Sequence, residues 1–187
     1  MDGMLNLPDL RVGDVKTIKI ATSIASGDDA GQPLDPEDGS TFLCFDPDRQ
    51  TSGTADSGSS TTLVDADRLE EDDLWLGMTL VVTDASDARE YRSEVTGFEQ
   101  ETNTLTFYAL PIAVAEGDAY RIEGHPLLPQ TAATVAGNEA SIQLTPDDAT
   151  GSPGRRVLVY RADFGTDSEE AVGTFSVLPS TAGERRG

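Results

Sequence analysis

The sequence has 187 residues, with 34 acidic side chains against 13 basic ones, a formal net charge of −21 and only two lysines, Lys16 and Lys19. So acidic a chain has no basic patch with which to displace counterions from phosphates, and we expect no nucleic-acid partner. It shows no apolar run long enough for a membrane span and no signal peptide, so we expect no membrane contact. Because molar salt shortens the screening length to about 3 Å and relieves repulsion among carboxylates, the charge predicts a hypersaline environment.

Almost every patterned segment alternates with the period of two that is typical of β-strands, and none sustains a helical stripe. The first predicted strand is 15–24, and an acidic loop rich in glycine and proline separates it from the next strand, at 41–45. Residues 46–48 (Asp-Pro-Asp) are predicted as a turn, and the small polar residues 50–60 as a linker.

The middle of the chain predicts a second group of strands. Acidic residues 67–73 predict a single helical turn, and Leu74-Trp75-Leu76 follows as an apolar anchor. The predicted strands of this group are 61–64, 77–83, 89–97, 103–109 and 118–122.

A third group of strands follows His125-Pro126. Gly137-Asn138 and residues 145–148 are predicted turns. The predicted strands are 131–135, 140–144, 155–162 and 171–178. About ten or eleven short strands, with turns roughly every 8–12 residues, predict an all-β protein built as a sandwich or small barrel.

Residues able to carry chemistry are present, but not in a catalytic pattern. His125 is the only histidine and has no recognisable nucleophile motif. Cys44, the only cysteine, lies between Leu43 and Phe45 and is predicted to be a small buried hydrophobe. We therefore predict no enzyme, no catalytic residue and no cofactor.

Several acidic clusters offer the oxygen ligands that Ca²⁺ or Mg²⁺ prefers, so a structural cation is compatible with the sequence. None of them follows the spacing of a calcium-binding loop, and no ligand set is assigned. The clusters are Asp28-Asp29, Asp35 with Glu37 and Asp38, Asp46 with Asp48, Asp65 with Asp67, and Asp72-Asp73.

Five apolar residues precede the first predicted strand: Met4, Leu5, Leu7, Leu10 and Val12. Such a segment either closes the edge of the core or docks on a partner. We keep both alternatives and take these residues as the candidate partner-docking segment.

Residues 53–122 contain, in order, a TLVDA segment, an acidic turn, an aromatic residue before GMTL, and a closing GDAYRI. This order resembles a β-module that recurs in phage and prophage virion proteins. The flanks carry Gly13-Asp14-Val15 to Ile20, VAGNEASIQL at 135–144, TPDD at 145–148, Pro153-Gly154 and GTFSVL at 173–178. They resemble the immunoglobulin-like N-terminal domain of phage baseplate upper proteins and head fibres.

Together the two resemblances imply a discontinuous architecture. Residues 9–49 and 125–180 would form an immunoglobulin-like β-sandwich, and residues 50–124 would form an inserted second small β-sandwich or barrel. The segments 50–60 and 124–129 would be linkers, and residues 1–8 and 181–187 would be terminal arms.

The resemblance implies a non-enzymatic virion structural protein of a tailed virus, and the charge adds a halophilic, archaeal host. We expect a capsid-surface decoration, a turret or a fibre-base subunit that forms a homo-oligomer, as a trimer, and binds the major capsid protein or another virion protein. One alternative is a component of the tail baseplate. A further alternative is a host-surface glycan-binding module with an aromatic platform around Trp75 or Tyr91.

Overall fold

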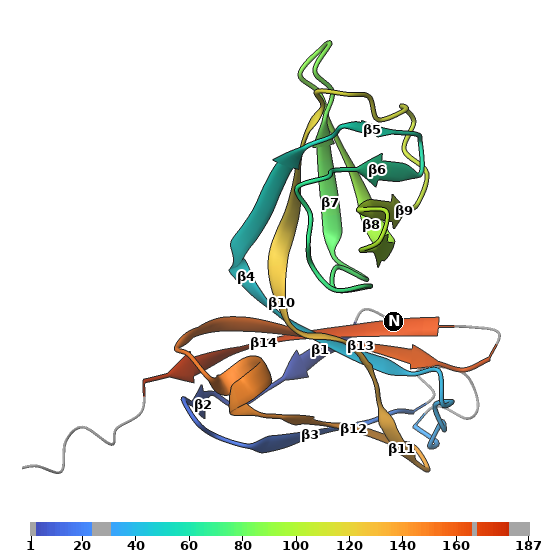
Figure 1. Ribbon diagram of the computed structural model, residues 1–187. Coiled ribbons are helices and arrows are strands. Elements are labelled where there is room, and N and C mark those ends of the chain that lie inside the picture. Colours follow the sequence, from blue (N-terminus) through green and yellow to red (C-terminus); the bar gives the residue numbers. More distant parts are fainter. Residues whose placement is uncertain (1–2, 24–30, 166–167, 180–187) are drawn as a thin grey trace, which may run out of the picture. The chain divides into compact units, whose positions relative to one another are not determined.

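The computed structural model describes residues 3–23, 31–165 and 168–179. Within these ranges the chain is all-β, with fourteen strands and one short helical turn, which confirms the predicted fold class (Figure 1). Contacts between Cα atoms divide the chain into two compact units. Unit 1 comprises residues 1–45 and 130–187, and unit 2 comprises residues 46–129.

Unit 1 is a sandwich of two sheets. One sheet has the order β1-β14-β13-β4, with β2 also paired to β14, and the other has the order β11-β12-β3. The strands are β1 (Gly3–Asn6), β2 (Leu10–Arg11), β3 (Lys16–Ala21), the first part of β4 (Thr41–Thr54), β11 (Thr134–Ala136), β12 (Glu139–Leu144), β13 (Gly154–Asp163) and β14 (Ser168–Leu178). This is the strand order of an immunoglobulin-like sandwich, in which β3, β12 and β11 take the places of strands B, E and D, and β4, β13 and β14 those of C, F and G.

The core of unit 1 follows from alternation along the strands. In β13, for example, residues 156, 158, 160 and 162 are all buried, because successive side chains point to opposite faces. Cys44 is fully buried on β4, as predicted. The buried apolar side chains are Leu10, Ile18, Phe42, Leu43, Cys44, Ala140, Leu144, Ala149, Leu158, Val159, Tyr160, Ala162, Phe175 and Val177.

The N-terminal segment belongs to the sandwich. Strand β1 pairs in parallel with Ala171–Thr174 of β14, and β2 pairs in parallel with Val177 and Leu178 of the same strand. The segment therefore covers the edge of β14, and residues 3–6 form a strand where the sequence suggested a terminal arm. Residues 181–187, the other predicted arm, lie outside the described residues.

Unit 2 is a small β-barrel that is not closed by strand pairing. Its sheet runs β4-β10-β7-β8-β9-β6-β5, and β5, which pairs only with β6, is joined to β4 along the chain. Strand β8 serves two neighbours because it bends between Val95 and Gly97, pairing with β7 before the bend and with β9 after it. The remaining strands are β5 (Ser57–Gly58), β6 (Thr62–Val64), β7 (Thr79–Thr83), β8 (Glu90–Glu99), β9 (Thr104–Phe107) and β10 (Ala119–Ala132).

Both predicted linkers are wrong, because β4 and β10 continue through them. Strand β4 runs through Pro47 to Thr54, and β10 runs through Gly124 and Pro126 to Ala132. Each proline lies just beyond the point at which pairing on one side of its strand ends. Strand β13 pairs with β4 only up to Phe45, and β7 pairs with β10 only up to Glu123. A proline is tolerated where its missing N–H is not needed by a ladder.

Helical structure is nearly absent from the described ranges. The expected turn at 145–148 is the helical turn η1 (Pro146–Thr150), whereas 67–73 contains tight turns in place of the predicted helical turn. The buried Arg156 holds the η1 loop by donating to the carbonyl oxygens of Ala149 (3.0 Å) and Ser152 (2.8 Å). Over these ranges we find no helix with the length and apolarity that a membrane crossing requires.

Candidate functional site

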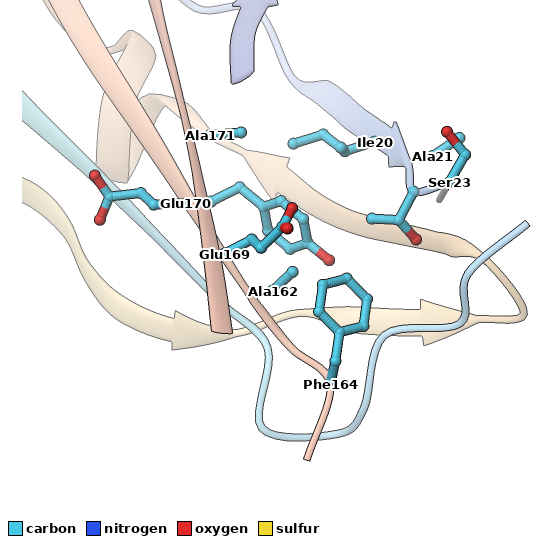
Figure 2. A pocket seen from close by; sticks show the side chains of 10 residues that line it. Ile20, Ala21, Ser23, Ala162, Phe164, Glu169, Glu170 and Ala171 are labelled. Carbon is cyan, nitrogen blue, oxygen red and sulfur yellow. The ribbon is translucent and has the colours of Figure 1, made fainter. Parts of the chain in front are cut away.

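A hollow of about 180 Å³ lies in unit 1, where the end of β3 approaches β13 and the start of β14. In Figure 2, Ala162 and Phe164 lie across from Ile20 and Ala21, and Glu169 and Glu170 approach from β14. Its walls are mostly apolar, with hydroxyl and carboxylate groups contributed by Thr22, Ser23 and the two glutamates. The hollow can therefore accommodate an apolar group of a ligand whose adjacent groups are polar.

Tyr160 gives this hollow a polar feature in its wall. The residue is only 2% exposed, and its hydroxyl makes no hydrogen bond of normal geometry within the described residues. Burial raises the pKa of Tyr160, and the nearby hydroxyl of Ser40 offsets part of that rise. The phenol therefore stays protonated at neutral pH and can donate a hydrogen bond. A buried tyrosine hydroxyl normally forms such a bond.

A second hollow, of about 300 Å³, is lined by Gly39 and Gly165 from two loops and by Gln130 of β10 and Asp163 at the end of β13. Arg161 contributes to its wall and donates to Glu170 over 3.0 Å. Both hollows involve the connection between β3 and β4 and the connection between β13 and β14. These correspond to the B–C and F–G loops, which form the binding end of variable immunoglobulin domains. This end of the sandwich is our candidate functional site.

In unit 2, three polar side chains form a buried cluster. The Tyr120 hydroxyl donates to Asp65 Oδ2 over 2.6 Å, and Arg68 Nε donates to the Tyr120 oxygen over 2.6 Å. Burial favours a higher pKa for Asp65, but hydrogen bonds from Tyr120, from the Asp67 N–H and from Arg68 outweigh it, and the pKa of Asp65 is lowered. Burial and the hydrogen bond to Asp65 raise the pKa of Tyr120.

This cluster is a structural clamp. Arg68 also donates to the Ser52 carbonyl oxygen over 2.5 Å, so the cluster ties the turn after β6 to both β4 and β10. A Cβ atom at Gly53 would lie 2.4 Å from Asp65 Oδ2, which explains the glycine at this point of close approach. All members are satisfied by one another, which leaves no reactive group directed at a substrate.

Sequence reasoning missed Tyr160 and the Asp65–Tyr120 pair, although signals for both were present. Tyr160 lies in an alternating segment whose inward positions include Leu158 and Ala162. Asp65 belongs to the TLVDA segment and Tyr120 to the GDAYRI segment. The two residues are 55 positions apart in the sequence, and their side chains form a hydrogen bond in the fold.

His125, Trp75 and Tyr91, the histidine and aromatic candidates, are all buried or half-buried. His125 is half-buried on β10, and its ring lies edge-on to Trp75 with 5.9 Å between centroids. Trp75 is 1% exposed, so the hypothesis that it forms a glycan platform is wrong. Tyr91 is half-buried, and the more exposed ring of unit 2 is Tyr108, at 65%.

Three of the acidic clusters accept hydrogen bonds from backbone amides. Asp72 and Asp73 accept from the N–H groups of Gln100 (2.7 Å) and Phe98 (3.2 Å), and Asp46 accepts from the N–H of Asp48 (3.0 Å). No group of three or more potential metal-ligating side chains converges anywhere in the described part of the chain. Asp28 and Asp29 lie outside that part, and the structural cation stays a prediction.

The predicted docking residues differ in burial and in whether they belong to a strand. Met4 and Leu5 belong to β1, Leu7 and Val12 are half-buried, and Leu10 is buried in the core at 5% exposure. Leu10 is therefore unavailable to a partner, which corrects the prediction for that residue. Docking by the others stays a prediction, and the pairing of this segment with β14 supports the alternative that it closes the edge of the core.

Comparison with known protein families, with curated proteins and with solved structures finds no match to this chain.

Proposed function

We propose that this chain is a non-enzymatic structural subunit of the virion of a halophilic tailed virus, most directly a capsid-surface decoration, turret or fibre-base subunit. The observation that carries the proposal is that residues 46–129 form a compact β-unit inserted into the chain of an immunoglobulin-like sandwich. A sandwich with an inserted module is the architecture that the two sequence resemblances imply. The subunit would act as a homo-oligomer, as a trimer, bound to the major capsid protein or another virion protein.

The residues behind the resemblance support a structural role. Asp65 of the TLVDA segment bonds to Tyr120 of the closing GDAYRI segment. The aromatic residue before GMTL is the buried Trp75, and Met78 of GMTL is 2% exposed. Asp118 accepts from the N–H groups of Ala85 (2.8 Å) and Ala115 (2.9 Å) and so fixes two loops. These motif residues build the barrel, as expected of a module selected for assembly.

The charge distribution supports an outer position for unit 2. Residues 46–129 carry 18 acidic side chains against 5 arginines, whereas the remainder carries 16 against 8. Carboxylates keep a surface hydrated in concentrated salt, where their mutual repulsion is screened. The barrel would therefore face brine, and the sandwich would provide the contacts to other virion proteins.

Immunogold labelling tests this proposal. Antibodies against the folded protein would be applied, in molar salt, to tailed particles purified from a culture of the organism that encodes the chain. We expect gold on the head. Gold at the tail tip would replace the capsid assignment with a baseplate component. Particles free of gold, when the protein is detected in the same lysate, would overturn the virion proposal and favour a host-surface binding protein.

A further inference from the structure

Strand β3 has an uncovered edge. Its sheet has the order β11-β12-β3, and in the described ranges only β12 pairs with it (Figure 1). In the seven-strand immunoglobulin arrangement, strand A lies beside strand B, which corresponds to β3 here. In this chain, β1 and β2 lie on β14 instead. Among the described residues, none occupies the place beside β3 that another strand could take.

The register identifies the backbone groups on this edge. Thr22 N–H donates to the Asn138 carbonyl oxygen over 2.9 Å, which makes this a hydrogen-bonded pair. Such pairs alternate in an antiparallel ladder, so Ile20 and Ile18 also bond to β12, whereas Thr17, Lys19 and Ala21 face away from it. These three residues are exposed, and they present three N–H and three C=O groups in a row.

The charge of this edge is opposite to that of the rest of the molecule. The only two lysines of the chain, Lys16 and Lys19, both lie on β3 and are exposed. Lys19 reaches across to Glu139 on β12 at 2.6 Å and remains 61% exposed. Lys16 and Lys19 are three residues apart, so their side chains point to opposite faces of the sheet, and Lys19 shares the outer face with Thr17 and Ala21. An incoming strand with a carboxylate on that outer face would meet the Lys19 ammonium group, whereas a strand with basic residues there would be repelled.

The edge leads into the hollow described above. Ile20 and Ala21, at the end of β3, line the hollow together with the buried Tyr160. The walls also include Glu169 and Glu170, which disfavour a further carboxylate at this end. A strand on the β3 edge would thus place an apolar side chain in the hollow.

We propose that the β3 edge and the adjoining hollow bind an extended segment of a partner protein, with acidic residues on the outer face, opposite Lys19, and an apolar residue in the hollow. Main-chain pairing with Thr17, Lys19 and Ala21 would supply affinity, and the two side-chain preferences would supply specificity. A second copy paired through its own β3 is the less favourable occupant, because it would bring two lysine-bearing edges together. The inference holds for any partner protein and does not depend on the virion proposal.

Peptide binding tests the inference on the full-length protein. The probe is a fluorescein-labelled octapeptide of alternating valine and glutamate, and its anisotropy is followed at the lowest salt that keeps the protein folded. We expect saturable binding. A peptide of the same sequence, N-methylated at alternate residues so that one edge cannot donate hydrogen bonds, should not bind. A peptide of alternating valine and lysine should bind at least about ten-fold more weakly.

Two charge reversals complete the test. Lys19→Glu should weaken binding of the glutamate peptide about three- to ten-fold, with Lys19→Gln intermediate, and circular dichroism would verify that both variants fold. Arg89→Glu is the matched control, because Arg89 is 74% exposed, lies in unit 2 and should leave affinity unchanged. Equal binding of the N-methylated peptide, no binding of the glutamate peptide, or equal effects of both reversals would overturn the proposal. Self-association that Lys19→Glu alters would identify a second copy as the occupant and would also overturn it.

Discussion

The two units deal with sheet edges in opposite ways. In unit 2 the two terminal strands of the sheet, β4 and β5, follow each other along the chain, every other strand has two neighbours, and the interior is filled by side chains such as Trp75 and Met78. Unit 1 leaves β3 with one neighbour and keeps a hollow beside it. An unpaired edge is a liability that natural proteins usually cover. This difference is the reason why we propose partner binding for unit 1 and not for unit 2.

Two residues allow the units to be followed separately in the full chain. Trp75 is the only tryptophan and is buried in unit 2, so its fluorescence reports unfolding of that unit. Cys44 is the only cysteine and is buried in unit 1, so its reaction with a thiol reagent reports unfolding of the sandwich.

The largest expected effect is on unit 2. Asp65→Ala would leave Arg68 and Tyr120 without their buried acceptor, and removing one partner of a buried charge cluster costs about 3–5 kcal/mol. We expect the urea midpoint reported by Trp75 to fall strongly, while the midpoint reported by Cys44 stays in place. Asp67→Ala, two residues away and exposed, is the control and should change neither. Equal shifts of both probes after Asp65→Ala would show that the units do not unfold independently.

The same variant gives a pH test of the clamp. The pKa of Asp65 is lowered in the folded state, so its contribution to stability is present above the unfolded value of about 3.9 and is lost as the pH falls through the lower folded value. The difference in unfolding free energy between the wild type and Asp65→Ala should therefore shrink below about pH 4. A difference that stays constant down to acid pH would show that the carboxylate charge is not what the clamp needs.

The next largest effect is that of salt concentration, which should change the thermal stability of the two units to different extents. Unit 2 has 18 acidic against 5 basic side chains, and unit 1 has 16 against 8. Lowering the salt from molar to tens of millimolar lengthens the screening distance from about 3 Å to more than 10 Å and restores repulsion among carboxylates. We expect the thermal midpoint reported by Trp75 to fall further than that reported by Cys44. A flat response of both probes would contradict the predicted adaptation to hypersaline conditions.

Two tyrosine-to-phenylalanine substitutions should have effects of opposite sign. Tyr120→Phe removes a hydrogen bond to a buried carboxylate and should destabilise unit 2 by about 1.5–3 kcal/mol. Tyr160→Phe removes a buried hydroxyl without a partner and should stabilise unit 1 by about 1 kcal/mol. The measurement is urea unfolding, with Trp75 fluorescence for the first variant and Cys44 labelling for the second. A destabilising Tyr160→Phe would mean that the hydroxyl already has a partner within the protein.

Local pattern was enough to predict most of the strands and the all-β class, whereas the immunoglobulin-like sandwich with its insert came from the resemblance to virion modules. Alternation located β12 and β13, and β7 was located as an apolar run, since it is buried on both faces. It could not predict that β4 and β10 run through Pro47 and Pro126, because that depends on which neighbour each strand has lost at that point. It also could not find the candidate site. Tyr160 and Ile20 lie far apart in sequence, and only the pairing of strands brings them to one hollow.

The smallest expected effect concerns His125, the only histidine of the chain. Burial lowers its pKa, Arg49 adds to this, and Asp46 and Glu70 act in the opposite direction. Because the folded pKa lies below the unfolded value of about 6.5, the stability gained from neutral His125 is complete above that value and is lost as the pH falls through the folded pKa. The single imidazole Cε1–H resonance in a proton NMR titration should give a midpoint below 6.5. The loss of stability should be small, since the ring is half-buried, and His125→Gln should remove it. A midpoint at or above 6.5 would show that Asp46 and Glu70 outweigh burial, and that the edge-on contact with Trp75 does not keep the ring neutral.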